Sequence, residues 1–506
     1  MNTPTYIPDF PRRLALALLA LSLPVSAAEK ADATTSKIKT PAPAPRVAPT
    51  IPPPDAKAAQ VPEGYQVEVV LSGLQYPSSI EFSETSIFVA EAGNIDGDWL
   101  APARILEFPL ANPAGNSGKI VADQLSGPVT DLLMHKGKLY ISHRGKISVL
   151  DGGKVRDLVT DLPSFGDHHN NQLTVGPDGK IYVGQGSATN SGVVGVDNFL
   201  LGWLTPWPDF CDVPAKDIAL VGQVFESADP LSALGKNKAA MVKTAAFQPF
   251  GKTGPADAMV KGAIKSTGTI LRMDADGSNL EVYAWGLRNP FGVLWGPDGK
   301  LYASENGADE RGVRHIANCP DTLWVIKEGA WYGWPDFASG VAVTDPRFAP
   351  KGAPAPEFLM KEHPPVEKPL MTFEPHASVV KMDFSPGGKF GFEGQMFLAA
   401  SGDFAPATAL EQKRAGYWVK RIDVATGKAE PFFELKKSAM GEGDMAYTVT
   451  AGPKRPVDVR FSGDALYVVD IGAVAFTTSG VGPAPRAFPG SGVVWRVSRS
   501  LSVAGK

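Results

Sequence analysis

A nine-residue stretch occurs twice in nearly the same form and indicates the fold class: Gly176-Pro-Asp-Gly-Lys-Ile-Tyr-Val-Gly184 and Gly296-Pro-Asp-Gly-Lys-Leu-Tyr-Ala-Ser304. In each copy the Pro and the Asp favour a tight turn, the Gly that follows supplies a positive φ, and an apolar strand with a central Tyr comes next. We therefore interpret both Gly-Pro-Asp-Gly segments as hairpin turns and not as ligand-binding loops.

Four weaker copies of the pattern occupy residues 82–90, 134–142, 393–399 and 462–469. A second strand of alternating character follows every copy, at 104–108, 146–150, 269–273, 323–326, 418–422 and 493–497. A single hairpin cannot bury both of its faces, so six copies predict six sheets stacked radially. The expected fold is all-β: a six-bladed β-propeller with long inter-blade insertions. The largest insertion runs from about residue 188 to 264, and it is either a functional loop or a surface decoration.

The composition agrees with this fold class and excludes others. Of the 506 residues, 53 are Gly and 45 are Pro, and both disfavour helix interiors. Lys and Arg (49) nearly balance Asp and Glu (53), which gives a net charge of −4, and 43% of the residues are hydrophobic. A disordered chain has a more polar and more charged composition. Because no basic block occurs, the sequence also lacks the electrostatic footprint of a nucleic-acid-binding protein.

The N-terminal region has the pattern of a secretory signal peptide over residues 1–28. Arg12 and Arg13 precede a short apolar run from Leu14 to Leu23, and small residues typical of a cleavage site follow. Spanning a bilayer takes roughly 20 apolar residues, so this run is too short, and no later segment is a candidate membrane span. We expect a periplasmic or secreted protein.

Residues 29–60 are rich in Ala, Lys, Thr and Pro, a composition typical of an extended, disordered linker. The propeller is therefore expected to occupy residues 61–506. The chain has two cysteines, Cys211 and Cys319, whose spacing matches neither a zinc site nor covalent haem attachment. They form either one disulfide or two separate buried thiols.

The most pointed candidates for chemistry are two adjacent histidines, His168 and His169, in a polar loop ahead of the third repeat strand. A loop that leads into a strand projects at one end of a propeller, where sites lie. An imidazole beside a carboxylate, here Asp167, suits a general base because its ordinary pKa is about 6.5. A purely structural histidine is the alternative.

A second polar loop opens the fourth repeat, where Arg288 and Asn289 lie between Gly286 and Pro290. The guanidinium offers a fork to carboxylates, and the amide can donate and accept at a carbonyl, so the pair suits one shared ligand. A salt-bridged turn is the alternative.

Four segments together resemble the signature blocks of the soluble glucose/sorbosone dehydrogenase family. They are residues 167–178, 286–292, 305–307 and 331–335, the last of which has the sequence Trp-Tyr-Gly-Trp-Pro. The blocks follow the family's order with similar internal spacing, and the resemblance extends from about Gln75 to Val497. It implies a six-bladed propeller that binds pyrroloquinoline quinone (PQQ) and Ca²⁺, in agreement with the repeat count.

The resemblance also implies roles for individual residues. His168 matches the family's catalytic histidine, which takes the proton of a substrate hydroxyl while hydride leaves the same carbon for the quinone. Arg288 and Asn289 match the residues that hold the quinone oxygens, and Arg288 would also stabilise charge that develops there.

Four more positions would complete the cofactor site. Gly307 and Ala308 match backbone carbonyls that ligate the calcium, a hard ion that prefers oxygen ligands. Lys413 and Arg455 match cations that bind the cofactor carboxylates, with solvated surface charges as the alternative interpretation.

Three departures from the family pattern bear on ligand binding. Val457 replaces the second family arginine, and Ser187 stands where the best-studied branch has an aspartate close to the histidine. The segment from Gly127 to Leu132 lacks the glutamine that contacts glucose. Another aldose, a sorbosone-like sugar or another polyol therefore fits as well as glucose.

The leading hypothesis is a quinone-dependent dehydrogenase that oxidises a sugar or sugar-like alcohol. Its electrons would pass to an external acceptor, such as a cytochrome or a quinone pool, because no haem-attachment motif occurs in the sequence. Two alternatives stay open: a calcium-dependent lactonase on a propeller scaffold, and a non-catalytic binding propeller.

Overall fold

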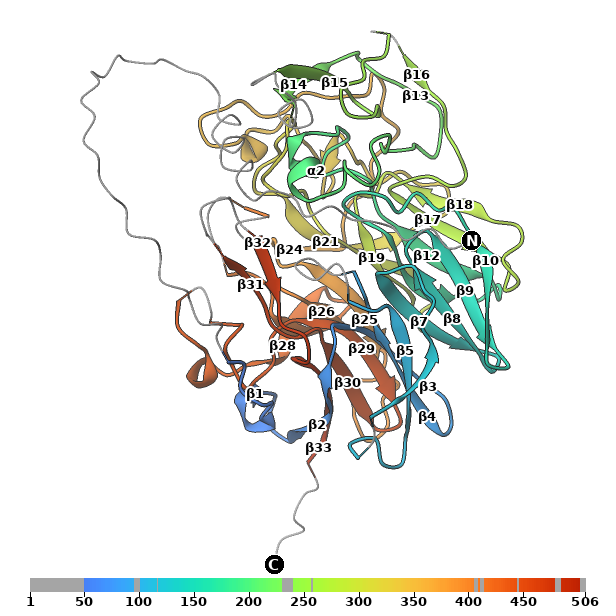
Figure 1. Ribbon diagram of the computed structural model, residues 1–506, viewed down its shortest axis with the longest axis vertical. Coiled ribbons are helices and arrows are strands. Elements are labelled where there is room, and N and C mark those ends of the chain that lie inside the picture. The colour runs from blue at the N-terminus through green and yellow to red at the C-terminus, as the bar shows by residue number, and fades with distance from the viewer. Residues whose placement is uncertain are drawn as a thin grey trace, which may run out of the picture.

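Six antiparallel sheets, five with four strands and one with five, make up the architecture of the computed structural model (Figure 1). The structure describes residues 50–94, 101–115, 117–229, 240–255, 258–404, 408–409, 414–443, 446–477 and 484–500. The expected signal peptide and most of the expected linker lie outside these residues. The predicted six-bladed β-propeller is confirmed, and all six repeat hairpins form the second and third strands of a blade.

The first three blades follow the chain. Blade one contains β3 (Pro77–Phe82), β4 (Ser86–Glu91), β5 (Arg104–Pro109) and β6 (Lys119–Ala122). Blade two contains β7 (Val129–His135), β8 (Lys138–His143), β9 (Lys146–Asp151) and β10 (Lys154–Val159). Blade three contains β11 (Asn170–Val175), β12 (Ile181–Gln185), β17 (Thr269–Met273) and β18 (Glu281–Trp285).

The last three blades include one strand taken from the N-terminal end of the propeller. Blade four contains β19 (Pro290–Trp295), β20 (Leu301–Glu305), β21 (Pro320–Ile326) and β24 (Met371–Pro375). Blade five contains β25 (Val379–Phe384), β26 (Met396–Ala400), β27 (Trp418–Asp423) and β28 (Lys428–Leu435). Blade six contains β29 (Pro456–Ser462), β30 (Ala465–Asp470) and β33 (Gly492–Arg499), and its outer strand is β2 (Tyr65–Leu74). The pairing of β2 with β33 closes the ring.

The end of the expected linker is structured, which corrects its predicted boundary at residue 60. The short helix η1 (Ala56–Ala58) leads into β1 (Ala59–Gln60), which pairs with β28 and adds a fifth strand to blade five. Apolar packing explains why residues 56–60 adopt a defined structure, because Ala59 is buried in the apolar cluster between blades five and six.

The two Gly-Pro-Asp-Gly segments are hairpin turns, as predicted. They join the first and second strands of blades three and four, and each is closed by a backbone hydrogen bond from the first Gly to the Lys four residues later. The repeat Tyr stabilises the turn: the hydroxyls of Tyr182 and Tyr302 each donate to the turn carboxylate, Asp178 and Asp298, at 2.9 Å.

The large insertion lies within blade three, between β12 and β17, and not between two blades. It contains α2 (Val196–Leu200) and two small hairpins, β13 (Ile218–Ala219) with β16 (Met259–Val260), and β14 (Val224–Ala228) with β15 (Met241–Ala245). Figure 1 shows these elements, in green, gathered at one end of the molecule. Trp203, Leu204 and Phe210 give the insertion an apolar core of its own.

Shorter excursions leave blades four, five and six. Blade four carries β22 (Phe337–Ala338), β23 (Val341–Ala342) and η2 (Pro346–Phe348). The helix η3 (Lys437–Ala439) follows blade five, and blade six carries the hairpin of β31 (Val474–Thr477) and β32 (Ala484–Ala487). None of the helices in the described ranges is long and apolar enough to cross a bilayer.

A buried ion-pair network fills the axis where the first strands of the blades meet. The ammonium of Lys381, on β25, lies 2.9 Å from Asp131 of blade two and 3.1 Å from Asp458 of blade six. It also donates to the backbone carbonyl of Ser78. Because the three charged side chains are almost completely buried, each depends on the others for its stability.

Candidate functional site

The candidate site lies at the end of the propeller that carries the insertion. Within an antiparallel blade, the loop before the first strand and the loop after the second strand lie at the same end. His168 precedes β11 and Ser187 follows β12, while Arg288 and Asn289 precede β19 and Gly307 follows β20. The topology of blades three and four therefore brings these predicted positions together.

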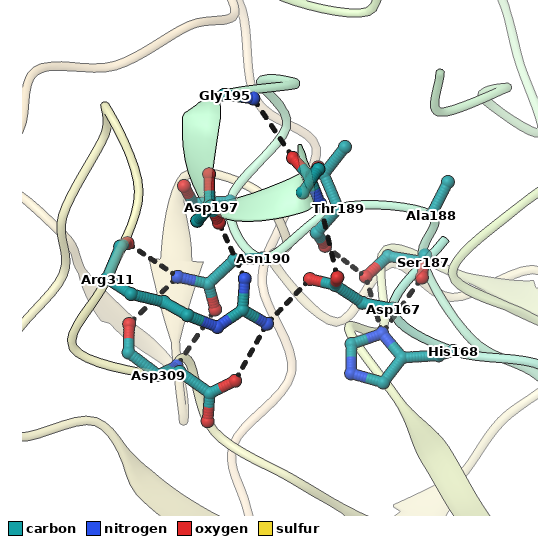
Figure 2. A network of polar contacts seen from close by, with 12 residues as sticks. Asp167, His168, Ser187, Ala188, Thr189, Asn190, Gly195, Asp197, Asp309 and Arg311 are labelled. Carbon is teal, nitrogen blue, oxygen red and sulfur yellow. Dashed lines mark hydrogen bonds and ion pairs between the residues drawn. The ribbon is translucent and has the colours of Figure 1, made fainter. Parts of the chain in front are cut away.

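His168 is held by one side of its ring. Its Nδ1 lies 2.8 Å from the carbonyl oxygen of Ser187 and 3.2 Å from the hydroxyl oxygen of the same residue (Figure 2). A carbonyl can only accept, so Nδ1 carries the proton and Nε2 keeps its lone pair. No hydrogen bond joins Nε2 to another of the described residues, and the ring is therefore arranged to accept a proton there.

The electrostatics of the loop keep His168 neutral. Burial lowers its pKa well below the ordinary value, and the nearby Arg288 guanidinium lowers the pKa further. The neighbouring His169 has a lowered pKa as well, first because of burial and then because of Arg144. The ring of His169 faces a different set of groups, since its Nδ1 contacts the carbonyl of Ser164.

Gly186 allows His168 and Asn289 to approach each other closely. A Cβ added at Gly186 would lie 2.4 Å from the Cβ of His168 and 2.7 Å from Oδ1 of Asn289. Any side chain at Gly186 would therefore displace one of these two groups. The absence of a side chain brings the histidine of blade three next to the amide of blade four.

Asn289 is fixed by a chain of amides across the boundary between these blades. Its Oδ1 accepts from Asn171 at 2.9 Å, and its Nδ2 donates to Asn306 at 2.8 Å. Asn306 donates in turn to the carbonyl of Val379 in blade five. The orientation of the Asn289 amide is thus set before any ligand binds.

Arg288 is buried, and its guanidinium is held by three neighbours. Nε and Nη2 donate to the backbone and side-chain oxygens of Asn190, Nη1 donates to the carbonyl of Asn306, and Nη2 lies 3.2 Å from Asp309. The backbone N–H of Arg288 donates to Glu305, whose carboxylate also accepts from Trp324. Burial raises the pKa of Glu305 to about 7.

The loop after β20 presents backbone oxygens. The N–H of Gly307 donates to Asp321 at 2.9 Å, and the hydrogen bonds of the described residues leave the carbonyl oxygens of Gly307 and Ala308 without a donor. Free carbonyl oxygens are ligands that suit Ca²⁺. Within the described ranges, no three His, Cys, Asp or Glu side chains come together in a way that could hold a metal ion.

Arg455 lies in a different environment from the one expected of a free cofactor ligand. Its guanidinium donates to the backbone carbonyls of residues 401–403 and contacts the hydroxyl of Tyr417. It also lies over the ring of Phe404, 4.1 Å from the centroid. These contacts tie blade six to the loop after β26. Val457, two residues later, packs in the apolar cluster between blades six and one.

Two other predictions have different outcomes. Lys413 lies outside the described residues, so its predicted role stays a prediction. Cys211 and Cys319 are both free, so they form no disulfide; Cys319 is buried as the second alternative expected, and Cys211 is half-buried. Burial raises the pKa of each thiol to about 12.

Sequence reasoning missed three residues that bind these loops to one another: Asn190, Asp309 and Arg311. The amide of Asn190 donates to the carbonyls of Asp309 and Arg311, and its Oδ1 accepts from the N–H of Asp309. Asp309 and Arg311 directly follow the Gly307-Ala308 pair, so their charges were visible in the sequence. Their partners were not, because those partners lie on segments far away along the chain.

With this geometry in view, comparisons with known proteins identify a related family. Residues 261–408 match the family model described as glucose/sorbosone dehydrogenase. The resemblance recognised in the sequence is thereby confirmed. The matched segment contains Arg288, Asn289, Gly307 and Ala308. A relative, quinoprotein glucose dehydrogenase B of Acinetobacter calcoaceticus, is 26% identical over 196 residues, which cover 36% of this chain and 29% of the relative.

Solved structures agree on the fold. The PQQ domain of a pyranose dehydrogenase from Coprinopsis cinerea, in its holo form, covers 89% of this chain and 99% of its own, with 16% identity and a TM-score of 0.52. A calcium structure of a family AA12 carbohydrate-active enzyme from Trichoderma reesei covers the same shares, with 15% identity and a TM-score of 0.53. At these identities the likeness concerns the propeller alone.

Proposed function

We propose that this protein is a PQQ-dependent dehydrogenase that oxidises a sugar or sugar-like alcohol, with His168 as the general base. The observation that carries the proposal is the state of His168. Its Nδ1 is bound to Ser187, its Nε2 is open, and its pKa is lowered, so the ring is a neutral base at neutral pH. The family match over residues 261–408 supports the reaction class.

The residues around His168 suit a quinone cofactor and a calcium ion. Asn289 and Arg288 would hold the quinone oxygens, and the carbonyl oxygens of Gly307 and Ala308 would ligate Ca²⁺. The bound quinone would supply the hydride acceptor. Lys413 and Arg455 are the proposed partners of the cofactor carboxylates, although the contacts of Arg455 with residues 401–403 would first have to open.

The chain's own groups divide the chemistry between them. His168 Nε2 would take the hydroxyl proton of the substrate, and the carbonyl of Ser187 would keep the ring in the correct tautomer. The fixed guanidinium of Arg288 and the fixed amide of Asn289 would face the charge that develops in the transition state, and preorganised groups need no reorientation during the reaction.

The substrate range, cellular location and electron acceptor remain part of the proposal. The substrate would be an aldose, a sorbosone-like sugar or another polyol, and the insertion would shape its pocket. The protein would act in the periplasm or outside the cell and would pass its electrons to a cytochrome or a quinone pool.

A direct experiment tests this function. Purified apoprotein is incubated with PQQ and Ca²⁺, and reduction of an artificial dye is followed over a panel of sugars and polyols. Dye reduction that requires PQQ supports the proposal. Failure of every substrate, without a cofactor absorption spectrum, contradicts it and favours the binding propeller. Lactone hydrolysis without PQQ would favour the lactonase. At the propeller axis, Asp131 and Asp458 are already paired with Lys381, and Arg460 lies 3.9 Å from Asp131, which disfavours a metal at that position.

A further inference from the structure

One guanidinium joins three separate parts of the candidate site. Nη2 of Arg311 lies 2.8 Å from Asp167 and 3.0 Å from Asp309, and Nη1 lies 2.6 Å from Asp197 (Figure 2). The Arg311 side chain is only 15% exposed and that of Asp167 only 2%. These ion pairs are thus largely removed from water. Charge-assisted hydrogen bonds are stronger in such a buried environment than in water.

The three carboxylates come from segments that lie far apart along the chain. Asp167 directly precedes His168, Asp197 lies on α2 of the insertion, and Asp309 directly follows Ala308. The guanidinium is planar and donates in fixed directions, so it sets the positions of its partners more strictly than a point charge would.

The contacts of Asp167 carry this constraint to the histidine. Its backbone N–H donates to the carbonyl of Ala188, and its side chain accepts from Asn198 at 3.2 Å as well as from Arg311. The residue before His168 is therefore held through both its backbone and its carboxylate. This restraint places Nδ1 of His168 within hydrogen-bond distance of the carbonyl oxygen of Ser187.

We infer that Arg311 is a positioning residue for His168, which it acts on through Asp167, and that it locks the histidine loop to the loop of Gly307 and Ala308. The inference rests on the proposed function for the role of His168. Its test does not, because the state of the histidine ring can be measured in the apoprotein without cofactor or substrate.

Three ionisable groups act on the pKa of His168: Arg288, Arg311 and His169. All three lower it in addition to the effect of burial. Replacing Arg311 by a neutral side chain removes one cation and also leaves Asp167 without its strongest partner. Both changes favour the protonated imidazole, and a nearby unpaired charge shifts a pKa by about one unit or more.

The experiment follows the ring nitrogens of ¹⁵N-histidine-labelled apoprotein by NMR as a function of pH, with His168 assigned by comparison with His168→Gln. In Arg311→Met, the titration midpoint of His168 is expected to rise by about one pH unit. The Nδ1-protonated tautomer should no longer dominate. Arg311→Lys keeps the charge but loses the fork, so it should give a smaller shift in the same direction.

Arg314→Met is the matched control. Arg314 is also buried, with an ion pair to Asp336 at 2.8 Å, and its other side-chain contacts are the carbonyls of Ser191, Pro335 and Glu357. The Arg314→Met variant should have a lower thermal stability, but its His168 resonances should not change. If both Arg311 variants lower stability but leave the midpoint and tautomer of His168 unchanged, the role of Arg311 is purely structural and the inference is wrong. If Arg311→Met does not fold, Arg311→Lys decides by the same criterion.

Discussion

The Nδ1 of His168 lies 2.8 Å from the carbonyl oxygen of Ser187, so a neutral backbone group orients the imidazole. A carboxylate in that position would add a negative charge and raise the pKa of the ring. The carbonyl fixes the same tautomer without that charge. His168 is thereby correctly oriented and weakly basic, a combination that leads to the first two predictions.

Replacement of His168 by Ala should lower kcat by about 10²–10⁴-fold, which is the usual contribution of a general base. PQQ binding, followed by the cofactor absorption spectrum, should change little. His169→Gln serves as the control, because the ring of His169 contacts Ser164 and not Ser187. A larger loss in His169→Gln than in His168→Ala would reverse the assignment of the base.

The pH dependence of kcat/KM should report the lowered pKa of His168. A base works only when deprotonated, so activity should persist as the pH falls through about 6.5, the ordinary value for histidine, and decline only at lower pH. Ser187→Asp would place a carboxylate near Nδ1. We expect the acid limb of its profile to move to higher pH by about one unit. An unchanged limb would show that a group other than His168 controls it.

Calcium should raise the thermal unfolding midpoint of the apoprotein, and EGTA should reverse the effect, because an ion that binds only the folded state stabilises it. A Cβ at Gly307 would lie 2.6 Å from the carbonyl oxygens of Cys319 and Pro320. Gly307→Ala should therefore shift the loop and reduce the calcium-dependent increase.

Gly115→Ala is the control for this substitution, since the nearest atom to its added Cβ lies at 3.7 Å, an ordinary contact. The measurement is differential scanning fluorimetry with and without Ca²⁺. Equal calcium-dependent increases in the two variants would argue against ligation by the Gly307 loop.

Lys381→Met should reduce the free energy of unfolding by about 3–5 kcal/mol, because it removes the nearest cation of two buried carboxylates, Asp131 and Asp458. Lys389→Met, in the same blade, removes an ammonium whose side chain is 85% exposed and should cost less than about 1 kcal/mol. Denaturant unfolding measures both. Similar losses in the two variants would mean that the axial network contributes little.

The sequence predicted the blades because each one carries a local signal. In blade two, for example, the turn at Gly137, Tyr140 of the second strand and the alternating third strand that begins at Lys146 lie close together along the chain. The outer strand of blade six could not be predicted in this way. Tyr65 pairs with Arg499, which lies more than 400 residues later in the sequence, and no local sequence pattern indicates such a distant partner.

In the candidate site, too, local sequence signals could be predicted and contacts between distant segments could not. His168, Arg288 and Asn289 stand in short, distinctive polar loops, and the structure brings them together. The environment of Arg455 was unforeseen, because its carbonyl partners depend on the path of the loop after β26. Arg311 carries an ordinary charge in the sequence, and only the fold shows that three carboxylates converge on it.

The pairing of β2 with β33 has a consequence for how the protein is made. During synthesis β2 emerges early and β33 emerges last, so the ring stays open until nearly the whole propeller has left the ribosome. Over that period the edge of β2 lacks its partner, and an unpaired strand edge is a template for pairing with another chain. The ring therefore cannot close before β33 is available, and a chain that ends before Gly492 should remain an open ring prone to self-association.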